Sequence, residues 1–387
     1  MIRNLLADRG AYVVGIGLHR YQRRSDKSYV ELGLEAVRAA LGDAFGDPVE
    51  AWPNVDVAIT GTALLGMAPS RVMLARLGAS GLAIHQVENA SASGSTAVAQ
   101  AALSVSSGQT DVALAIGLDK PEPWRVAAAS AGIPSLEGGL VAPFTHFALL
   151  ASRYQREFGV SDEEIARVAV KNHRNGAKNP YAHRQKERSI EEVMQDPISG
   201  SLTRLQCCPV GEGAAAVVVA SADAIEKFGL DPARCPRIIG SVSRSQAFLE
   251  PGADADSALT IDTARRAFEQ VGLGPSDIDV LEVHDAFSVE ELFYLEAMGF
   301  CGPGESVKLL AEGAWDVGGR CAVSASGGLL AMGHPLGPTG TGQIVEIARQ
   351  LRGEAGLRQQ PDARYGVAHM VGLGAVCVMH VLERGKA

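Results

Sequence analysis

Glu88-Asn89-Ala90-Ser91-Ala92-Ser93-Gly94-Ser95 is the stretch from which the rest of this chain is best understood. It stands where a strand should turn into a helix that begins near Gly94. A side chain at such a turn is exposed, and the first N–H groups of the helix point toward any negative charge that develops beside it. Ser91 is therefore a candidate nucleophile. The alternative is that its hydroxyl caps the helix and shapes a pocket without reacting.

A shorter copy of this stretch, Ser324-Ala325-Ser326-Gly327, occurs 233 residues later, counted from Ser91 to Ser324. Other segments recur at similar offsets, 225 residues for the first strands and 223 for the later ones. The matching segments are 12–17 with 237–242, 29–41 with 259–271, 55–59 with 278–283, and 111–117 with 366–382. Alternation of strands and helices predicts buried sheets between layers of helices. We therefore expect two α/β halves related by pseudo-twofold symmetry.

The length of 387 residues exceeds what one hydrophobic core usually supports, which agrees with two core units. We place an N-terminal half at 1–235 and a C-terminal half at 236–387. The repeat is interrupted at about 121–206, where a helix is predicted to run from Ser161 through Asn172. Long insertions between core elements usually carry binding function, so we expect a loop or lid domain there.

Composition excludes several classes of protein. A formal net charge of −9 argues against a general nucleic-acid role, because phosphate binding needs a basic surface. No apolar run approaches the ~18 residues of a membrane helix, and the charged N-terminus is not a signal peptide, so we expect a cytoplasmic protein. The six cysteines show no CxxC or CxxH spacing, which predicts neither a metal site nor a disulfide framework.

Several short motifs, spread in order over nearly the whole chain, carry a family resemblance. They are the stretch from Asn89 to Ala97, Lys171-Asn172-His173, Cys207-Cys208-Pro209, His284-Asp285-Ala286-Phe287, the segment from Gly327 to Gly337, and Gly372-Leu373-Gly374. The sequence resembles the thiolase superfamily, and most closely its sterol-carrier-protein-type, lipid-transfer-protein-like branch. The resemblance implies a five-layered αβαβα fold of two pseudo-symmetric halves with an inserted loop domain, a homodimer, and a CoA thioester as substrate with no further cofactor.

The resemblance also assigns catalytic positions, and it shows that the family's cysteines are missing. Ser91 stands where thiolases carry the cysteine that is acylated. His334, in Gly-His-Pro, matches the histidine that activates the nucleophile or the leaving thiol, and His284 matches a residue that helps to form an oxyanion hole. The second, acid/base cysteine is absent from both of its usual places, Ala286 and the region of Ala368. Candidates to replace it are Tyr294, Tyr365 and His369.

Binding of CoA is expected at the loops around His334 and in the insertion. The loop residues are Ser243, Gly327, Gly372 and Gly374. The densest basic stretch of the chain runs from Lys171 to Arg188, and from it Lys178 and Arg184 are expected near the phosphates, because an acidic protein that binds a tetra-anionic ligand needs a local positive patch.

Some members of this branch lack the cysteines and cleave a C–C bond by retro-aldol chemistry, often with a small partner that has a zinc ribbon and an OB fold. The leading expectation is therefore an enzyme that acts on a C–C bond of a CoA thioester, as an aldolase/lyase or as an atypical acyltransferase in lipid, steroid or aromatic acid degradation. Two alternatives stay open. One is an acyltransferase that uses Ser91, and the other is an acyl-CoA- or lipid-binding protein without catalysis.

Overall fold

Ten strands form one mixed sheet in the computed structural model, which describes residues 4–121, 143–249, 254–373 and 376–386. The strands are β1 (Tyr12–Gln22), β2 (Val57–Gly61), β3 (Ala83–Val87), β4 (Val112–Asp119), β7 (Glu212–Ala220), β8 (Arg237–Ser245), β9 (Val280–Glu282), β10 (Ala322–Val323), β11 (Tyr365–Gly372) and β12 (Val376–Glu383). Their order is β10-β9-β11-β12-β8-β1-β7-β4-β2-β3. The block from β8 outward repeats the block from β1 outward strand for strand, with β12 and β7 as the antiparallel members. The predicted internal repeat is thus confirmed.

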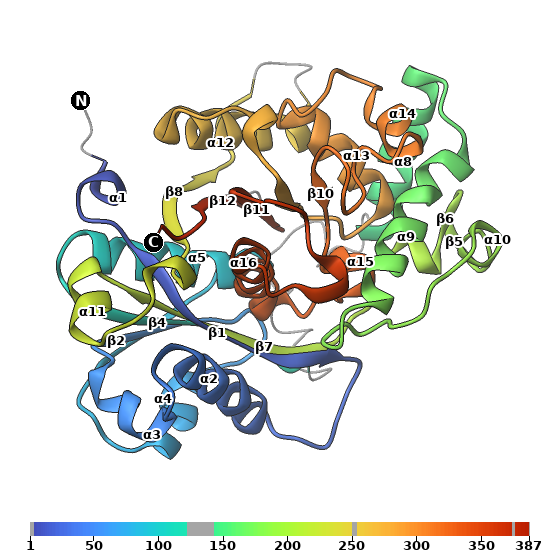
Figure 1. The fold of residues 1–387 in the computed structure, drawn as a ribbon. Coiled ribbons are helices and arrows are strands. Elements are labelled where there is room, and N and C mark those ends of the chain that lie inside the picture. The colour runs from blue at the N-terminus through green and yellow to red at the C-terminus, as the bar shows by residue number, and fades with distance from the viewer. Residues whose placement is uncertain (1–3, 122–142, 250–253, 374–375, 387) are drawn as a thin grey trace.

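The two blocks join through a short contact between β1 and β8. Tyr12 pairs with Arg237, the Val13 amide donates to the Pro236 carbonyl at 2.8 Å, and the Ile238 amide donates to the Ala11 carbonyl at 2.8 Å. Beyond this contact the blocks diverge and enclose two helices (Figure 1). The pseudo-twofold axis therefore passes between β1 and β8.

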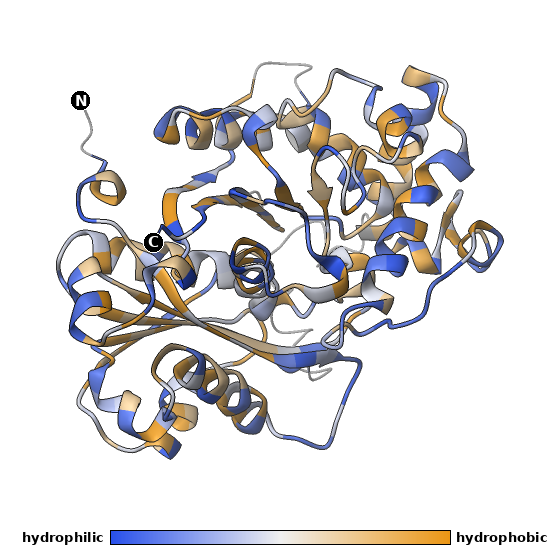
Figure 2. Ribbon diagram, viewed as in Figure 1, coloured by the Kyte–Doolittle hydropathy of each residue, from blue (hydrophilic) through white to orange (hydrophobic). Residues whose placement is uncertain are grey.

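Helices fill three layers around the two blocks of strands. The outer layers contain α2 (Tyr29–Phe45) and α4 (Pro69–Leu74) on one side, and α12 (Ala255–Val271) and α13 (Ser288–Ala297) on the other. The central layer is made by α5 (Ser93–Ser106) and α16 (Leu336–Arg352), which contact strands of both blocks. Figure 2 shows hydrophobic residues concentrated in the strands between these layers. This is the predicted αβαβα arrangement, and it explains why β4 and β7 are buried along their whole length.

Short helices complete the chain. They are α1 (Leu5–Asp8), α3 (Pro48–Ala51), α11 (Ala222–Lys227), α14 (Ser306–Ala311) and α15 (Gly328–Ala331), with 3₁₀ turns at Trp52–Asn54, Ala75–Leu77, Arg204–Gln206, Pro232–Arg234, Pro275–Asp277 and Gly356–Arg358. Within the described ranges, no helix has both the length and the apolar character required to cross a lipid bilayer.

The chain between β4 and β7 forms a separate group of elements over the C-terminal half. It contains α8 (Pro143–Phe158), α9 (Asp162–Ala177), α10 (Ile190–Val193), β5 (Pro197–Ser199) and β6 (Leu202–Thr203), while residues 122–142 lie outside the described residues. Ser161 and Glu164 form a capping box that starts α9, and the helix runs five residues beyond the expected end at Asn172. Because α9 packs against α13 and α15, the insertion lies next to the segments that carry His284 and His334.

The central helices α5 and α16 approach each other through residues with small side chains. A Cβ added at Gly94 would lie 2.2 Å from the Gly337 carbonyl oxygen, and one added at Gly340 would lie 2.1 Å from Ser95 Oγ. Thr341 Oγ1 donates to the Gly94 carbonyl at 3.2 Å. Contacts this close leave no room for a methyl group, so glycine fixes the distance between the two helices.

We expect Gly340→Ala to destabilise the protein although alanine is the better helix former. The added methyl would overlap Ser95, and overpacking of this kind typically costs about 1–3 kcal/mol. Gly42→Ala in α2 is the matched control, because its Cβ would meet only Pro48 Cγ at 3.6 Å. There the helix propensity of alanine should raise the melting temperature slightly. Thermal melts of both variants test this, and a Gly340→Ala protein as stable as the parent would contradict the close-contact account.

Candidate active site

Ser91 lies in a strained turn between β3 and α5. Ala90 has a φ of +48°, a value that residues other than glycine rarely adopt. Ser93 holds the turn, because its hydroxyl accepts the Asn89 amide at 2.9 Å and donates to the Ala90 carbonyl at 2.6 Å. The residue at the helix cap is Ala92, which makes no side-chain cap bond, so the interpretation of Ser91 as a helix cap is wrong. Its hydroxyl instead lies 3.0 Å from His334 Nε2.

His334 is held in the segment between α15 and α16, as its glycine and proline neighbours predict. Its Nδ1 lies 3.0 Å from Thr339 Oγ1, and that hydroxyl donates to the Pro335 carbonyl at 2.5 Å. The Thr339 oxygen must therefore accept from Nδ1–H, which leaves Nε2 without a proton to accept from Ser91; this tautomer follows from the hydrogen-bond partners. Burial lowers the pKa of His334 to about 4, so the ring is neutral near pH 7.

The chain of Ser91, His334 and Thr339 differs from a hydrolase triad in its third member. In a triad a carboxylate stabilises the imidazolium that forms when the serine loses its proton. Thr339 is neutral, and the pKa of His334 is low because the ring is buried. The pair can position a hydroxyl group, but it is poorly suited to make Ser91 a nucleophile.

His284 follows β9 by two residues, at the strand end where it was expected. Its ring meets the ring of His334 edge to face, with 5.4 Å between centroids. Its Nδ1 lies 2.9 Å from the Met370 sulfur, which can only accept, so Nδ1 carries the proton. Within the described residues Nε2 has no hydrogen-bond partner. Burial, together with His334 and His369, lowers the pKa of His284 well below its ordinary value, so its free nitrogen is a neutral acceptor.

His369 and Tyr294 form the layer behind His284. His369 Nδ1 lies 3.5 Å from the His284 amide nitrogen, and its ring centroid is 4.9 Å from that of Tyr294. The Tyr294 hydroxyl donates to Glu290 Oε1 at 3.2 Å. Burial lowers the pKa of His369 to about 3. Tyr365 begins β11, about 13 Å along the strand from His369 at ~3.3 Å per residue, and thus far from the histidine pair.

A buried polar network fixes the strand end that carries His284. Asp285 accepts from the Asn172 side chain at 2.6 Å and from the Leu329 amide at 2.7 Å, and Lys171 lies 3.1 Å from Glu291. Burial and the charge of Glu291 raise the pKa of Asp285 well above its ordinary value. The network joins α9 of the insertion to the site, and it places Lys171 inside the protein, away from any surface patch.

Most of the basic stretch is engaged within the protein. Arg184 donates to the Cys207 and Leu330 carbonyls at 2.9 Å each, whereas the side chain of Lys178 is exposed. Three others pair with carboxylates: Arg174 with Asp316, and Lys186 and Arg188 with Glu192. Arg184 therefore orders the loop before β7 in addition to any contact with a ligand.

The glycine loops expected to contact CoA lie close to the candidate catalytic segments. A Cβ at Gly372 would lie 2.3 Å from the Asn89 carbonyl, and one at Gly327 would lie 2.8 Å from Gly176 Cα. Ser243 is exposed on β8 opposite Val378. Gly374 falls outside the described residues.

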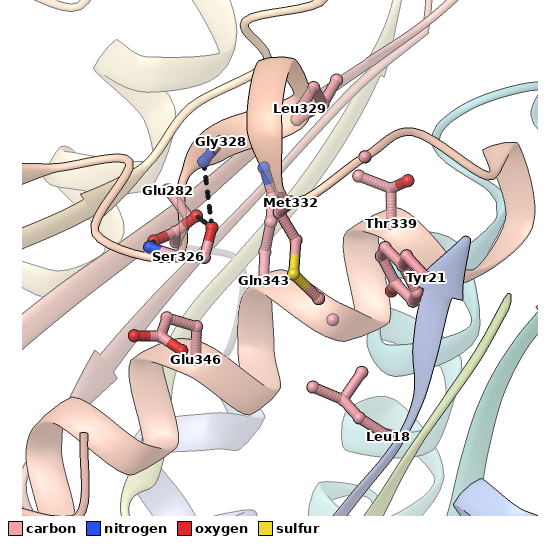
Figure 3. A pocket seen from close by; sticks show the side chains of 12 residues that line it. Leu18, Tyr21, Glu282, Ser326, Gly328, Leu329, Met332, Thr339, Gln343 and Glu346 are labelled. Carbon is pink, nitrogen blue, oxygen red and sulfur yellow. Dashed lines mark hydrogen bonds between the residues drawn. The ribbon is translucent and has the colours of Figure 1, made fainter. Parts of the chain in front are cut away.

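A small cavity lies between strand β1, helix α16 and the segment that contains Met332 (Figure 3). Its volume is about 10 Å³, enough for one water molecule and too small for a substrate. Glu282 borders it and accepts from the Ser326 hydroxyl at 2.6 Å. Burial and the charge of Glu346 raise the pKa of Glu282 to about 8. In the part of the chain that the structure describes, no cluster of side chains is arranged to hold a metal ion.

Sequence reasoning did not find three residues on which this geometry depends. Thr339 fixes the tautomer of His334, Met370 fixes that of His284, and Asp119 accepts the Gly337 amide at 2.6 Å and so anchors the start of α16. Only Thr339 left a signal in the sequence, since a hydroxyl five residues after the histidine of a Gly-His-Pro segment falls in the first turn of the next helix. The other two come from distant parts of the chain.

Comparison with known proteins matches both halves to one family. The family described as "Thiolase, N-terminal domain" matches residues 15–223, and "Thiolase C-terminal domain-like" matches residues 247–384. Benzoylsuccinyl-CoA thiolase subunit BbsB of Thauera aromatica is 34% identical over 376 residues, 95% of this chain and 96% of that protein. Sterol carrier protein 2 of Rattus norvegicus is 32% identical, over 97% of this chain and 72% of that protein.

Solved structures agree. The Ltp2-ChsH2(DUF35) aldolase has a TM-score of 0.80 and 26% identity, covering 97% of this chain and 98% of the other. Human mitochondrial 3-ketoacyl-CoA thiolase shares the fold at a TM-score of 0.72 and 19% identity, with both chains fully covered. Both halves are matched in order, and relatives above 30% identity align along nearly the whole length. The chain therefore belongs to the thiolase family, in the branch of sterol carrier protein 2 and the lipid-transfer-protein-like relatives.

Proposed function

We propose that this protein cleaves a C–C bond of a CoA thioester by retro-aldol chemistry and forms no covalent acyl-enzyme. The observation that carries the proposal is the environment of Ser91, whose hydroxyl faces a neutral histidine backed by a threonine in place of a carboxylate. A relative named an aldolase supports the type of reaction, and a relative named a benzoylsuccinyl-CoA thiolase supports a CoA thioester as the substrate.

The proposed reaction starts from a β-hydroxyacyl thioester. The β-hydroxyl proton passes to His284 Nε2, the Cα–Cβ bond breaks, and its electron pair moves into the thioester carbonyl to give an enolate. The β-carbon leaves as an aldehyde or ketone. An enolate beside the two rings raises the pKa of His284 and His334 again, because opposite charge favours the protonated form. Donors aimed at such an oxyanion typically lower the barrier by about 3 kcal/mol each.

The surroundings of the site favour an apolar acyl group. A buried apolar cluster flanks the histidines and contains Ala92, Ala148, Leu202, Ala286, Phe287, Leu329, Met370 and Val378. The ring of Phe147 from α8 stacks on Phe287 at 4.3 Å between centroids. A lipid, steroid or aromatic acyl chain suits such walls, because removal of apolar surface from water is favourable. Ser243 of β8, Gly327, Gly372 and the exposed Lys178 are proposed to hold the CoA part.

A second candidate is an acyltransferase that uses Ser91. The 3.0 Å contact with His334 favours it, since a nucleophile needs a base within hydrogen-bond reach. It requires the serine to lose a proton to a histidine whose pKa burial has lowered to about 4, which is the argument against it.

A partner subunit is also proposed. The names of two relatives indicate assemblies, the subunit BbsB and the Ltp2-ChsH2 aldolase. We propose a comparable small subunit, with a zinc ribbon and an OB fold, for this chain. Activity assays should therefore use the protein alone and with any subunit that co-purifies.

We expect incubation with acetyl-CoA or acetoacetyl-CoA to leave the intact mass of the protein unchanged. Ser91→Ala should retain cleavage of β-hydroxyacyl-CoA esters within about tenfold of the parent, because only a hydrogen bond worth ~1 kcal/mol is lost. Mass spectrometry of the protein and of the products checks both points. An acyl group mapped to Ser91 would establish the acyltransferase instead.

Replacement of His284 by alanine should lower the cleavage rate by about 100-fold, with folding intact, because the proton acceptor and the charge beside the enolate are both lost. For the parent protein, kcat/KM should stay flat between pH 8 and about pH 5.5. Burial lowers the pKa of His334 to about 4, so the neutral rings persist until well below pH 6.5. The prediction would be contradicted by an inflection near pH 6.5 in the pH profile of kcat/KM that is absent from the profile of His284→Ala. Such a result would show that His284 titrates like an exposed histidine.

A homodimer is proposed through the exposed edge of the sheet. Strand β3 pairs only with β2 among the described strands, its residues are largely exposed, and the chain continues from it directly into the Ser91 turn. An unpaired strand edge is a ready site for pairing with a second copy.

Ile84→Lys in β3 should convert the dimer into a monomer, because pairing of this edge strand would remove an exposed apolar side chain from water and would have to desolvate the lysine charge instead. Ile261→Lys on α12 is the control, with similar exposure, 48% against 41% for Ile84. Light scattering gives the mass of both variants. A dimer that survives Ile84→Lys would exclude this edge as the interface.

A further inference from the structure

Cys208 lies between the two segments that carry the histidines. Its amide donates to the Ala286 carbonyl at 2.8 Å, and the His334 amide donates to the carbonyl of the next residue, Pro209, at 3.4 Å. The short chain segment 208–209 is therefore hydrogen-bonded on one side to the His284 segment and on the other to the His334 loop. Ala286 also occupies one of the two positions at which the resemblance to thiolases implies an acid/base cysteine.

The side chain of Cys208 packs against the apolar cluster beside the histidines while staying half-buried. Burial and the nearby charge of Glu290 raise the pKa of this thiol, so it keeps its proton near neutral pH. The thiol of the neighbouring Cys207 has a hydrogen-bond partner of its own, because it donates to the Thr203 carbonyl at 3.3 Å. Two adjacent cysteines thus have separate environments.

A second feature marks this place as a ligand site. His284 is 7% exposed, its Nδ1 is used by Met370, and its Nε2 has no partner within the described residues. Ser91 and His334 stand beside it. Nε2 of His284 therefore remains available to a ligand beside the Ser91 hydroxyl and the His334 ring.

We infer that Cys208 is the acid that returns a proton to the α-carbon of the substrate. The inference rests on the proposed retro-aldol function and supplies the step that the lost family cysteines leave open. The Cys208 S–H bond breaks, a C–H bond forms at Cα of the enolate, and the acyl thioester results. The thiolate then recovers a proton from the imidazolium of His284, which had received it from the β-hydroxyl. No proton or electron is gained or lost over the cycle.

The test follows hydrogen exchange at Cα, which does not require C–C cleavage. The parent protein and three variants, Cys208→Ala, Cys208→Ser and Cys207→Ala, are incubated in D₂O with acetyl-CoA and with the acyl-CoA product of any β-hydroxyacyl ester that is cleaved. Mass spectrometry measures deuterium uptake. We expect both Cys208 variants to lose at least about 100-fold in exchange rate, the usual contribution of a positioned acid/base group. Cys207→Ala should keep the parent rate.

Each result decides between the two proposals. Parent exchange in Cys208→Ala would overturn the role of Cys208, and cleavage by the parent protein would then leave the lyase proposal standing. Exchange without cleavage by the parent would refute the lyase proposal, and the variants would still test Cys208. A parent protein with neither activity would overturn both. The serine in Cys208→Ser is close to the thiol in size. If this variant has the melting temperature of the parent protein but a lower exchange rate, the loss is caused by proton transfer and not by packing.

Discussion

The close approach of α5 and α16 is the constraint on which the site depends. Helix α5 follows β3 of the N-terminal half and α16 follows α15 of the C-terminal half, and Ser91 and His334 precede their first turns. They meet within 3.0 Å because glycines at 94, 337 and 340 let the helices touch. Asp119 adds a polar anchor, since its carboxylate binds the Gly337 amide and the Thr62 hydroxyl. A single methyl group at this crossing would separate Ser91 from His334 without a change at either residue.

Burial decides what the paired side chains can do. Three histidines stand in low-dielectric surroundings that lower their pKa values, and in the free protein they are neutral. A neutral ring accepts a proton from a substrate hydroxyl only when negative charge develops beside it, so the site is poised for an anionic transition state. A carboxylate hydrogen-bonded to Nδ1 of His334 would instead have raised the pKa of the ring and made it a general base in the free protein. Thr339 in that place fits a mechanism without an acyl-serine.

The fold could be predicted from the sequence because the same order of strands and helices occurs in both halves of the chain. The two copies of strand, helix and strand gave the halves, and the recurrence of Ser-Ala-Ser-Gly marked the two central turns. The places of Ser91, His284 and His334 in the fold could be predicted, because each follows a strand or sits between glycine and proline. The remaining contacts could not be found this way. Met370 comes 86 residues after His284, and Asp119 reaches Gly337 across 218 residues, so only the folded chain pairs them. The two carbonyl partners of Arg184 could not be found from the sequence either, because they are set by tertiary structure.

Equivalent turns in the two halves carry out different tasks. Ala90 and Ser324 both adopt positive φ after the third strand of their half, at +48° and +53°. In the N-terminal half the turn leads straight into α5 and presents Ser91. In the C-terminal half a short helix, α15, and the His334 loop are inserted before the matching helix α16. The N-terminal half inserts its long segment at a different point, between β4 and β7, where the C-terminal half has only a few residues between β11 and β12. The two halves thus share one topology, but each has a different loop extended, which makes the site asymmetric. Cys208 lies near the end of the longer extension, the segment between β4 and β7.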